Sequence, residues 1–315
     1  MSRFIMLRII QGLLTLVLVS VLTFFLINLA PGGPRAVMNF ESSAEQREAL
    51  TKQLGLDKPV IQRYLVWLGD VVQGDLGKSL DSQQPVAALL KERFPNTVIL
   101  ALSTLIFTLL IGIPVGVYAA MKRGRWMDRL VTFISTFGMA IPEFWLGILL
   151  IIIFSVIYQV LPASGMITSG SDFAWGDLLK HMILPVLTLS ILILPNIIRF
   201  TRSAMVDVIE LDYIRTARAK GLGVFRVFFK HALHNALVPI AAIIGLIIPI
   251  LLGGTVVVEN VFGWPGMGRL AVQAATNRDY TLVMGITMLI GAIVIITNML
   301  TDIMYTFLDP RIRYE

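Results

Sequence analysis

Six long apolar runs alternate with short polar segments along this chain. A helix of about 20 apolar residues is long enough to cross a bilayer core of about 30 Å, so each run predicts a transmembrane span. The first run follows Arg3 and Arg8 as in a signal peptide. It is longer than a typical apolar signal region and shows no clear cleavage site, so we expect it to remain as a span. The runs cover roughly Ile9–Ala30, Val98–Met121, Leu130–Tyr158, Ile183–Ile198, Leu237–Val258 and Leu282–Leu308.

The third run is too long for one straight span, and Pro142 is expected to break or kink it. Glu143, beside that proline, is the most polar position within a predicted span. A carboxylate in a membrane costs about 2.5 kcal/mol or more and usually faces the protein interior or a water-filled cavity. Pro142 and Glu143 therefore either line a translocation path or mark the start of the helix that resumes after the break.

Composition supports a membrane protein. Hydrophobic residues make up 56% of the 315 positions and charged residues 15%, and the mean hydropathy is +0.80. A soluble domain has about 25% charged residues, so a soluble globular protein is excluded. The chain contains no cysteine, which excludes disulfides and thiol chemistry.

The distribution of Lys and Arg predicts the orientation. With the N-terminus inside, the four inside segments hold two, four, seven and two basic residues, or 15 of the 26 in about 61 positions. The outside segments hold the other 11 in about 111 positions. The positive-inside rule therefore favours six spans with both termini inside. This bias accounts for much of the net charge of +6, so no nucleic-acid partner is expected.

The segments outside the membrane differ in character. Residues 1–95 combine the first span with a long outer segment that we expect to form a cap, including short helices at Ala44–Leu54 and Val60–Val72, the second lying on the membrane surface. Residues 96–308 form the remaining transmembrane domain, and residues 309–315 form an inside tail.

The inside loop at about 203–236 has an amphipathic pattern. Val206, Ile209, Tyr213 and Ala217 recur at helical spacing from Ser203 to Lys220. Gly221 and Gly223 then favour a helix end, and a second helix is predicted over Val224–Ala236. By itself the pattern fits either a docking element or a basic helix that lies on anionic lipid.

Several ordered motifs resemble one family over essentially the whole chain. The loop carries Arg215-Thr216-Ala217, three further residues and Gly221, and it is similar to the cytoplasmic loop of ABC importer permeases. Its His231-Ala232-Leu233-His234 departs from the generic pattern in the manner of the dipeptide, oligopeptide and nickel branch. The long outer segment resembles the first of two non-identical permeases. Further matching motifs are Leu54–Pro59, Arg199–Met205, Val258–Gly266 and Asp309–Arg313.

The resemblance implies an all-α membrane protein with the six-span, type I ABC importer permease fold. It implies a second homologous permease, two cytoplasmic ATPase subunits that bind ATP and Mg, an extracytoplasmic binding protein, and the plasma membrane of a prokaryote. The chain itself would bind no cofactor. Its substrate would be a dipeptide or oligopeptide, with nickel complexes, glutathione and oligosaccharides as alternatives. The ATPase-coupling residues would be Arg215, Thr216, Ala217, Arg218, Ala219, Lys220, Gly221, Leu222 and Gly223.

Other chemistry has weaker support. Gly77-Lys78-Ser79 echoes a phosphate-binding loop, but position 72, where the first glycine belongs, is Val72. His231 and His234 are three apart, and the remaining histidine, His181, is predicted on the other side of the membrane. We therefore expect neither a metal site nor an enzyme.

Two matters stay open at this point. Glu259 and Asn260, at the outer end of the fifth run, either face a substrate entrance or have a structural role. A stand-alone secondary transporter or channel, and a membrane scaffold that moves nothing, are the alternative functions. Ion-coupled carriers usually place several ionisable groups at mid-membrane and often show inverted repeats, and neither pattern is evident here.

Overall fold

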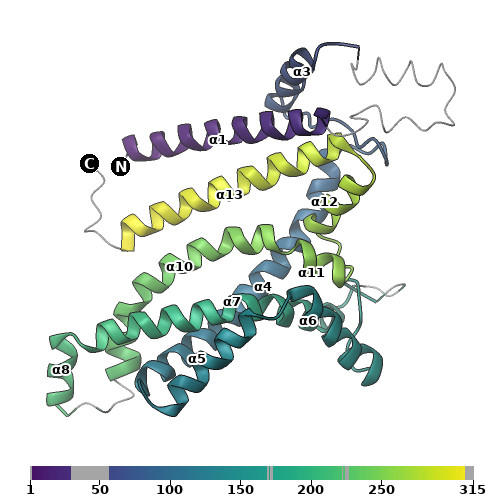
Figure 1. The fold of residues 1–315 in the computed structure, drawn as a ribbon. Coiled ribbons are helices and arrows are strands. Elements are labelled where there is room, and N and C mark those ends of the chain that lie inside the picture. The colour runs from purple at the N-terminus through teal and green to yellow at the C-terminus, as the bar shows by residue number, and fades with distance from the viewer. Residues whose placement is uncertain are drawn as a thin grey trace. The chain divides into compact units, whose positions relative to one another are not determined.

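The computed structural model describes residues 2–29, 57–168, 170, 173–221, 223 and 227–308. These residues form helices and no strand (Figure 1), with one isolated antiparallel bridge between Lys78 and Pro85. The predicted helix at Ala44–Leu54 lies outside the described residues. The elements are α1 (Ser2–Leu29), α3 (Val60–Val72), α4 (Val86–Met121), α5 (Trp126–Met139), α6 (Glu143–Leu150), the π-helix η2 (Ile151–Ile157), α7 (Trp175–Ile209), α8 (Asp212–Ala219), the π-helix η3 (Val227–Ala232), α10 (Leu233–Gly254), α11 (Val256–Val261), α12 (Met267–Thr276) and α13 (Tyr280–Leu308).

The long helices correspond to the predicted apolar runs. Five helices of the described residues are long and apolar enough to cross a membrane, and a sixth span results if α5 and α6–η2 are counted together. These two parts are bent by 96°. The bend falls at residues 140–142, so the predicted break at Pro142 is confirmed.

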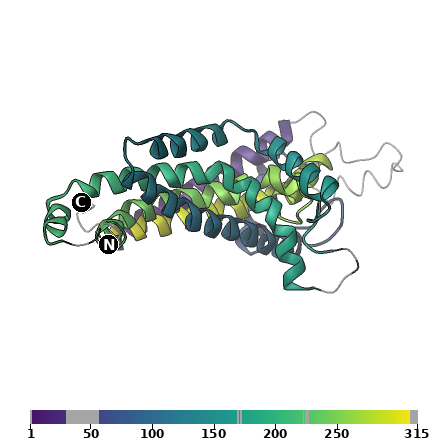
Figure 2. The same ribbon diagram turned by 90° about the horizontal axis from the view of Figure 1, so that it is seen from below.

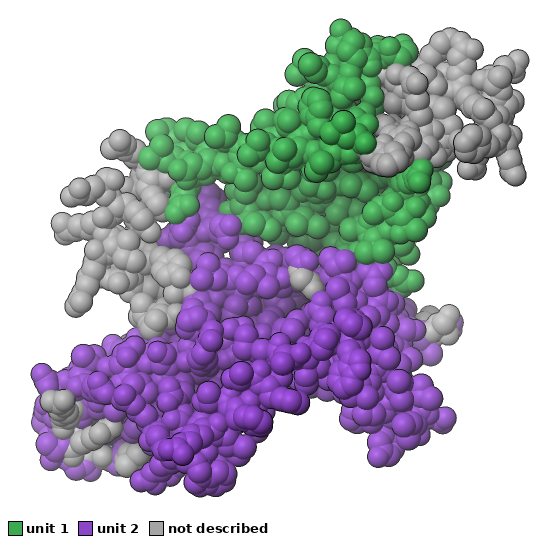
Figure 3. Space-filling model, in the orientation of Figure 1, with its two compact units in different colours: residues 1–97, 265–296 green, residues 98–264, 297–315 purple. Residues whose placement is uncertain are grey.

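The chain forms two compact units (Figure 3). Residues 1–97 and 265–296 make up unit 1, and residues 98–264 and 297–315 make up unit 2. In unit 1, α3 matches its predicted range and packs against α1: Tyr64, its buried residue, contacts Phe24 and shares a 2.9 Å hydrogen bond with the Ser20 hydroxyl. An aromatic contact and a buried hydrogen bond thus fix α3 to the first predicted span.

A second part of unit 1 fixes the segment before α4. The Ser79 hydroxyl donates a 2.5 Å hydrogen bond to the buried Asp279 carboxylate, and Asn277 Nδ2 donates to Asp81 at 2.8 Å. Close packing continues along α4, because a Cβ at Gly285 would lie 2.4 Å from Val86 Cγ1. The Gly77-Lys78-Ser79 stretch is therefore part of a turn that is tied to the start of α13.

Unit 2 is organised around α7, whose 35 residues include Pro185 and Pro195. Helices α5 and α10 both pack on α7, as Figures 1 and 2 show. The close approach of α4 to α7 requires glycine. A Cβ at Gly112 would lie 2.6 Å from Ile197 Cγ2, and one at Gly116 would lie 2.6 Å from Thr201 Cβ. These two glycines form the small-xxx-small spacing that lets membrane helices meet closely.

The inside loop differs from its prediction. The single helix expected from Ser203 to Lys220 is two helices, because α7 ends at Ile209 and α8 begins at Asp212. Glu210 and Leu211 lie between them, with the Leu211 N–H bonded to the Val208 carbonyl at 3.1 Å. This break lets the next turn fold back toward α7.

The second predicted helix of the loop also needs correction. Residues 224–226 lie outside the described residues. From Val227 onward the chain forms η3 and passes without a break into α10, so the described part of Val224–Ala236 is the start of the fifth predicted span. Val227, Ala232 and Ala236 are buried in one hydrophobic cluster of unit 2, which is consistent with this continuity.

Candidate functional site

The predicted coupling residues lie on α8 and the turn after it. Arg215, Thr216, Ala217, Arg218 and Ala219 are helical, and Lys220 and Gly221 follow in a turn. Gly223 lies just beyond, and Leu222 lies outside the described residues.

The end of α8 is exposed and tightly turned. Thr216, Ala219, Lys220 and Gly221 are all exposed, and the Lys220 N–H bonds to the Thr216 carbonyl at 3.0 Å. Gly221 has φ +79°, in the left-handed region that glycine adopts without strain, and a Cβ there would meet no atom within 4 Å. The turn therefore presents small side chains and the Lys220 ammonium group at an open tip.

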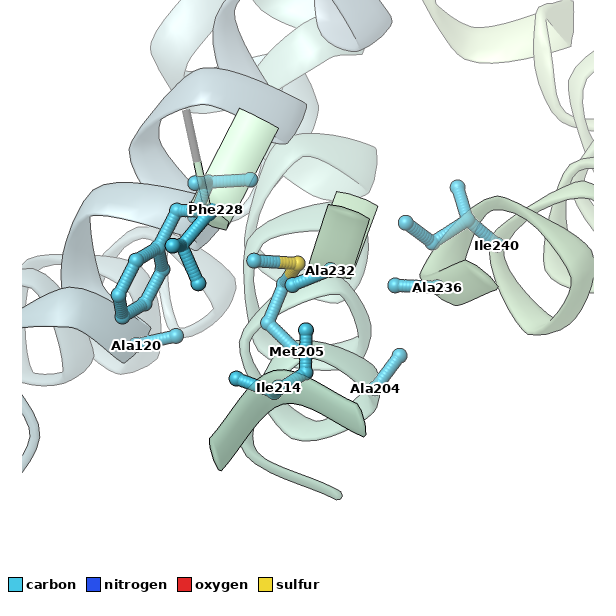
Figure 4. Close-up of a cluster of buried hydrophobic side chains, with 10 residues drawn as sticks. Ala120, Ala204, Met205, Ile214, Phe228, Ala232, Ala236 and Ile240 are labelled. Carbon is cyan, nitrogen blue, oxygen red and sulfur yellow. The ribbon is translucent and has the colours of Figure 1, made fainter. Parts of the chain in front are cut away.

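The opposite side of α8 is anchored in the core of unit 2. Ile214 is fully buried in a cluster that includes Met205 of α7, Phe228 of η3 and Ala120 of α4 (Figure 4). Asn235 Nδ2 of α10 also donates to the Tyr213 hydroxyl at 2.7 Å. An eight-residue helix is too short to be stable alone, so these contacts hold it in place.

Sequence reasoning missed Ile214. The predicted apolar stripe included Tyr213, which is 41% exposed, and passed over Ile214, which is 0% exposed. The stripe assumed one continuous helix, and the break at Glu210 and Leu211 changes the rotation of every later residue. The available signal in the sequence was an isoleucine in an otherwise polar stretch, between Tyr213 and Arg215.

A second set of contacts ties the α4–α5 turn to the end of α7. Arg202 donates to both carboxylate oxygens of Asp128, from Nε at 2.5 Å and from Nη2 at 2.7 Å. Asp128 is 4% exposed and also accepts the Gly124 N–H at 2.9 Å. Arg123 pairs with Glu210 at 2.6 Å, at the break before α8. The basic turn is thereby fixed beside the start of α8.

Pro142 and Glu143 lie at the break of the third predicted span. Pro142 is at the N-cap position of α6, with φ −62° and ψ 132°, and Glu143 is the first residue of that helix. Carboxylates are favoured in the first turn because the exposed N–H groups carry partial positive charge. The helix-start interpretation fits this placement, and a role in the translocation path stays a prediction.

Glu259 and Asn260 lie on α11. Glu259 is fully buried and accepts a 2.9 Å hydrogen bond from the Thr255 hydroxyl, and its carbonyl accepts the Trp264 N–H at 2.8 Å. Asn260 is exposed, and its side chain donates to the Val256 carbonyl at 2.7 Å. In this conformation both residues stabilise the segment 255–264. A role at a substrate entrance stays a prediction.

Among the described residues, no group of three or more His, Asp or Glu side chains is arranged to hold a metal ion. His181 is 6% exposed, and its Nδ1 lies 3.0 Å from the Asp177 carbonyl within α7.

Two family models match the chain. Residues 1–101 match the N-terminal model of the binding-protein-dependent transport system membrane component, and residues 112–314 match the model of the inner membrane component itself. The chain belongs to this family. It is thus a multi-pass transport permease, and its fold is that of the ABC importer permeases.

Curated relatives match over the full length. The chain is 42% identical over 316 residues to the oligopeptide transport system permease AppB of Bacillus subtilis, covering 100% of both chains. It is 38% identical over 338 residues to the dipeptide permease DppB of Escherichia coli K12, again covering 100% of both. It is 40% identical to the glutathione permease GsiC of Escherichia coli O6:H1 over 316 residues, also with full coverage of both chains.

A solved structure supports the same fold. The chain resembles one chain of the MetNI methionine ABC transporter, whose crystal structure shows an inward-facing conformation, with a TM-score of 0.58 and 20% identity. The match covers 70% of this chain and 96% of that one. The type I importer permease fold expected from the motifs is therefore confirmed.

Proposed function

We propose that this permease carries short peptides across a prokaryotic plasma membrane as part of an ATP-driven importer. It pairs with a second, homologous permease, and an extracytoplasmic binding protein delivers the substrate. Two cytoplasmic ATPase subunits bind ATP and Mg, and this chain binds no cofactor. Both of its termini lie inside. The observation that carries the proposal is a helix tip at which Thr216, Ala219, Lys220 and Gly221 are exposed, while the opposite side of the helix is anchored through Ile214 in the core of unit 2.

The anchoring suits α8 to transmit force. When the ATPase subunits close on ATP, a groove that holds the α8 tip moves with them. A loosely attached helix would bend at its base and lose that motion. Ile214 and the Asn235–Tyr213 hydrogen bond attach α8 to several helices of unit 2, so displacement of the tip shifts α7 and α10 together.

The relatives favour a peptide substrate. Their names specify oligopeptides, dipeptides and glutathione. Glutathione is itself a tripeptide, so the three substrates share a short peptide backbone with a terminal carboxylate and amine. Nickel complexes and oligosaccharides lack this common chemistry. We therefore assign short peptides to this chain.

The test is affinity purification from native membranes followed by reconstitution. Wild type should recover ATPase subunits and a second permease, and liposomes should take up a labelled dipeptide only with ATP. Gly221→Pro should lose the ATPase subunits, because proline cannot adopt φ +79°. Gly74→Pro is the matched control, since Gly74 also has a positive φ and open surroundings but belongs to unit 1.

Two results would contradict the proposal. A chain recovered alone that moves solute without ATP would be a secondary transporter. Equal ATPase recovery from both proline variants would place the docking contact elsewhere. Because the chain has no cysteine, single cysteines at Lys220 and Asp75 also test the orientation: an impermeant thiol reagent should label position 75 from outside and position 220 only from inside.

A further inference from the structure

An open hollow of about 550 Å³ lies where the α4–α5 turn meets α7, and the coupling residues do not contribute to it. It combines three arginine side chains and one carboxylate with a hydroxyl and one aromatic ring. Such a mixture suits an anion that carries an apolar group. The lining residues are Arg123, Gly124, Asp128, Arg129, Thr132, Phe133 and Arg202.

The hollow is lined by more positive than negative side chains. Asp128 neutralises Arg202, and Glu210 neutralises Arg123. Arg129 is exposed, and among the described residues its side chain has no ion-pair partner. The hollow therefore keeps a net positive charge.

Asp128 also builds the site. Asp128 accepts hydrogen bonds from two of the five guanidinium N–H groups of Arg202, one on Nε and one on Nη2. Because Asp128 is buried, this pair holds the plane of the guanidinium group in one orientation. The other N–H groups of Arg202, which is 31% exposed in its side chain, have no further acceptor among the described residues. A preordered guanidinium beside a free arginine is suited to a phosphate, which takes several charge-assisted hydrogen bonds.

An apolar stripe begins at the hollow and follows α5. Trp126 is 68% exposed, Phe133 is 67% exposed and Phe137 is 61% exposed. Leu130 and Ile134, also exposed, complete one face of the helix at spacings of three and four residues. An exposed apolar face of this kind suits contact with hydrocarbon. The chemistry is thus anionic at the hollow and apolar along the adjoining helix.

We propose that the hollow binds the phosphate group of an anionic phospholipid, with Arg129 and Arg202 at the phosphate and the acyl chains along the α5 stripe. Basic recesses between membrane helices recognise lipid head groups in this way. An acidic surface of an ATPase subunit would satisfy the arginines, but a soluble subunit gives no reason for the apolar stripe that continues from them. The inference uses the proposed function only to place the lipid in the inner leaflet.

The experiment counts lipids that stay bound to the purified full-length chain, with whatever subunits accompany it, by native mass spectrometry. The protein is reconstituted into nanodiscs of phosphatidylglycerol or of phosphatidylcholine, and it is then released from the nanodiscs for the measurement. Wild type should retain phosphatidylglycerol in preference to phosphatidylcholine. Arg129→Gln should lower that retention about fivefold, from about 1 kcal/mol for one basic residue near a membrane surface.

The matched control is Arg125→Gln, which removes a charge from the same exposed turn at a residue that does not line the hollow. It should retain lipid as wild type does, and Arg129→Lys should restore most of the retention. Arg129 is exposed, so none of these variants should affect folding.

Three outcomes would overturn the proposal. Equal losses of phosphatidylglycerol retention in Arg125→Gln and Arg129→Gln would show that retention depends on the overall charge and not on this hollow. Competition by millimolar inorganic phosphate alone, with no preference between the lipids, would show a site for a free anion. Unchanged lipid retention with loss of ATPase subunits in Arg129→Gln would show a protein contact. Failure of the proposed function, with no ATPase recovered from wild type, would leave the lipid count unaffected, so the two failures are distinguishable.

Discussion

Replacing Ile214 by alanine tests whether α8, the proposed coupling helix, depends on one buried side chain. Ile214 is 0% exposed and contacts residues of α7 and η3 in its cluster. The substitution removes three carbons, which corresponds to about 2.4 kcal/mol at about 0.8 kcal/mol per buried CH₂. The cavity left behind raises the expected cost into the range of about 2–5 kcal/mol. A helix of eight residues has no comparable stability of its own.

The expected result is local. The long helices of unit 2 keep the rest of their packing, so Ile214→Ala should insert into the membrane at the wild-type level. Helix α8 should lose its fixed position, and both ATPase recovery and ATP-driven dipeptide uptake should fall severalfold. Ile214→Val removes one carbon, costs about 0.5–1.5 kcal/mol and should show an intermediate effect.

The matched control is Leu211→Ala. Leu211 lies just before α8 and is 49% exposed, so its truncation leaves no cavity in the chain. Proteolysis at the residues after Gly221 gives an independent measure of α8 mobility, and it should accelerate in Ile214→Ala alone. If both alanine variants behaved alike in proteolysis and in transport, the buried anchor would not be the reason that α8 holds its position.

Three further substitutions test other contacts. Arg202→Ala leaves the buried Asp128 carboxylate without its ion-pair partner and should lower the thermal midpoint of the purified permease. Because Arg202 is partly exposed, the loss of stability should be smaller than the about 3–5 kcal/mol of a fully buried pair. An unchanged midpoint would contradict this prediction. Gly116→Ala places a Cβ 2.6 Å from Thr201 Cβ and should cost about 1–3 kcal/mol in the same melt, whereas Gly69→Ala, with open surroundings, should not. Glu143→Gln should slow peptide uptake with ATPase recovery intact if the carboxylate lines the path; normal uptake would leave it the helix-start role.

The spans were predictable because their signal is local. About 20 consecutive apolar residues indicate a span wherever they occur, and α13 begins two residues before its predicted run and ends with it. The break at Pro142 was also predictable, since proline removes a helix hydrogen bond by its own covalent structure. In both cases the decisive information lies within the segment itself.

The site was predictable only in part, because its remaining determinants are long-range. Asp128 and Arg202 are 74 residues apart, and nothing local shows that they meet. The break at Glu210 and Leu211 carries no proline or glycine, so the helical pattern was extended across it. That error placed Tyr213 on the buried face in the place of Ile214. Tertiary packing, which a single sequence does not display, determines both the Asp128–Arg202 contact and the burial of Ile214.

The contacts of α7 suggest why both α7 and α5 should respond to a displacement of α8. Within unit 2, Met205 of α7 packs on Ile214, and Arg202, less than one turn earlier, holds Asp128 at the start of α5. A displacement of α8 therefore reaches the end of α7 and the start of α5 over the same few residues. Helix α5 ends at the 96° bend beside Glu143. Because packed helices move as nearly rigid bodies, the bend is the place in this span where such a displacement would be absorbed.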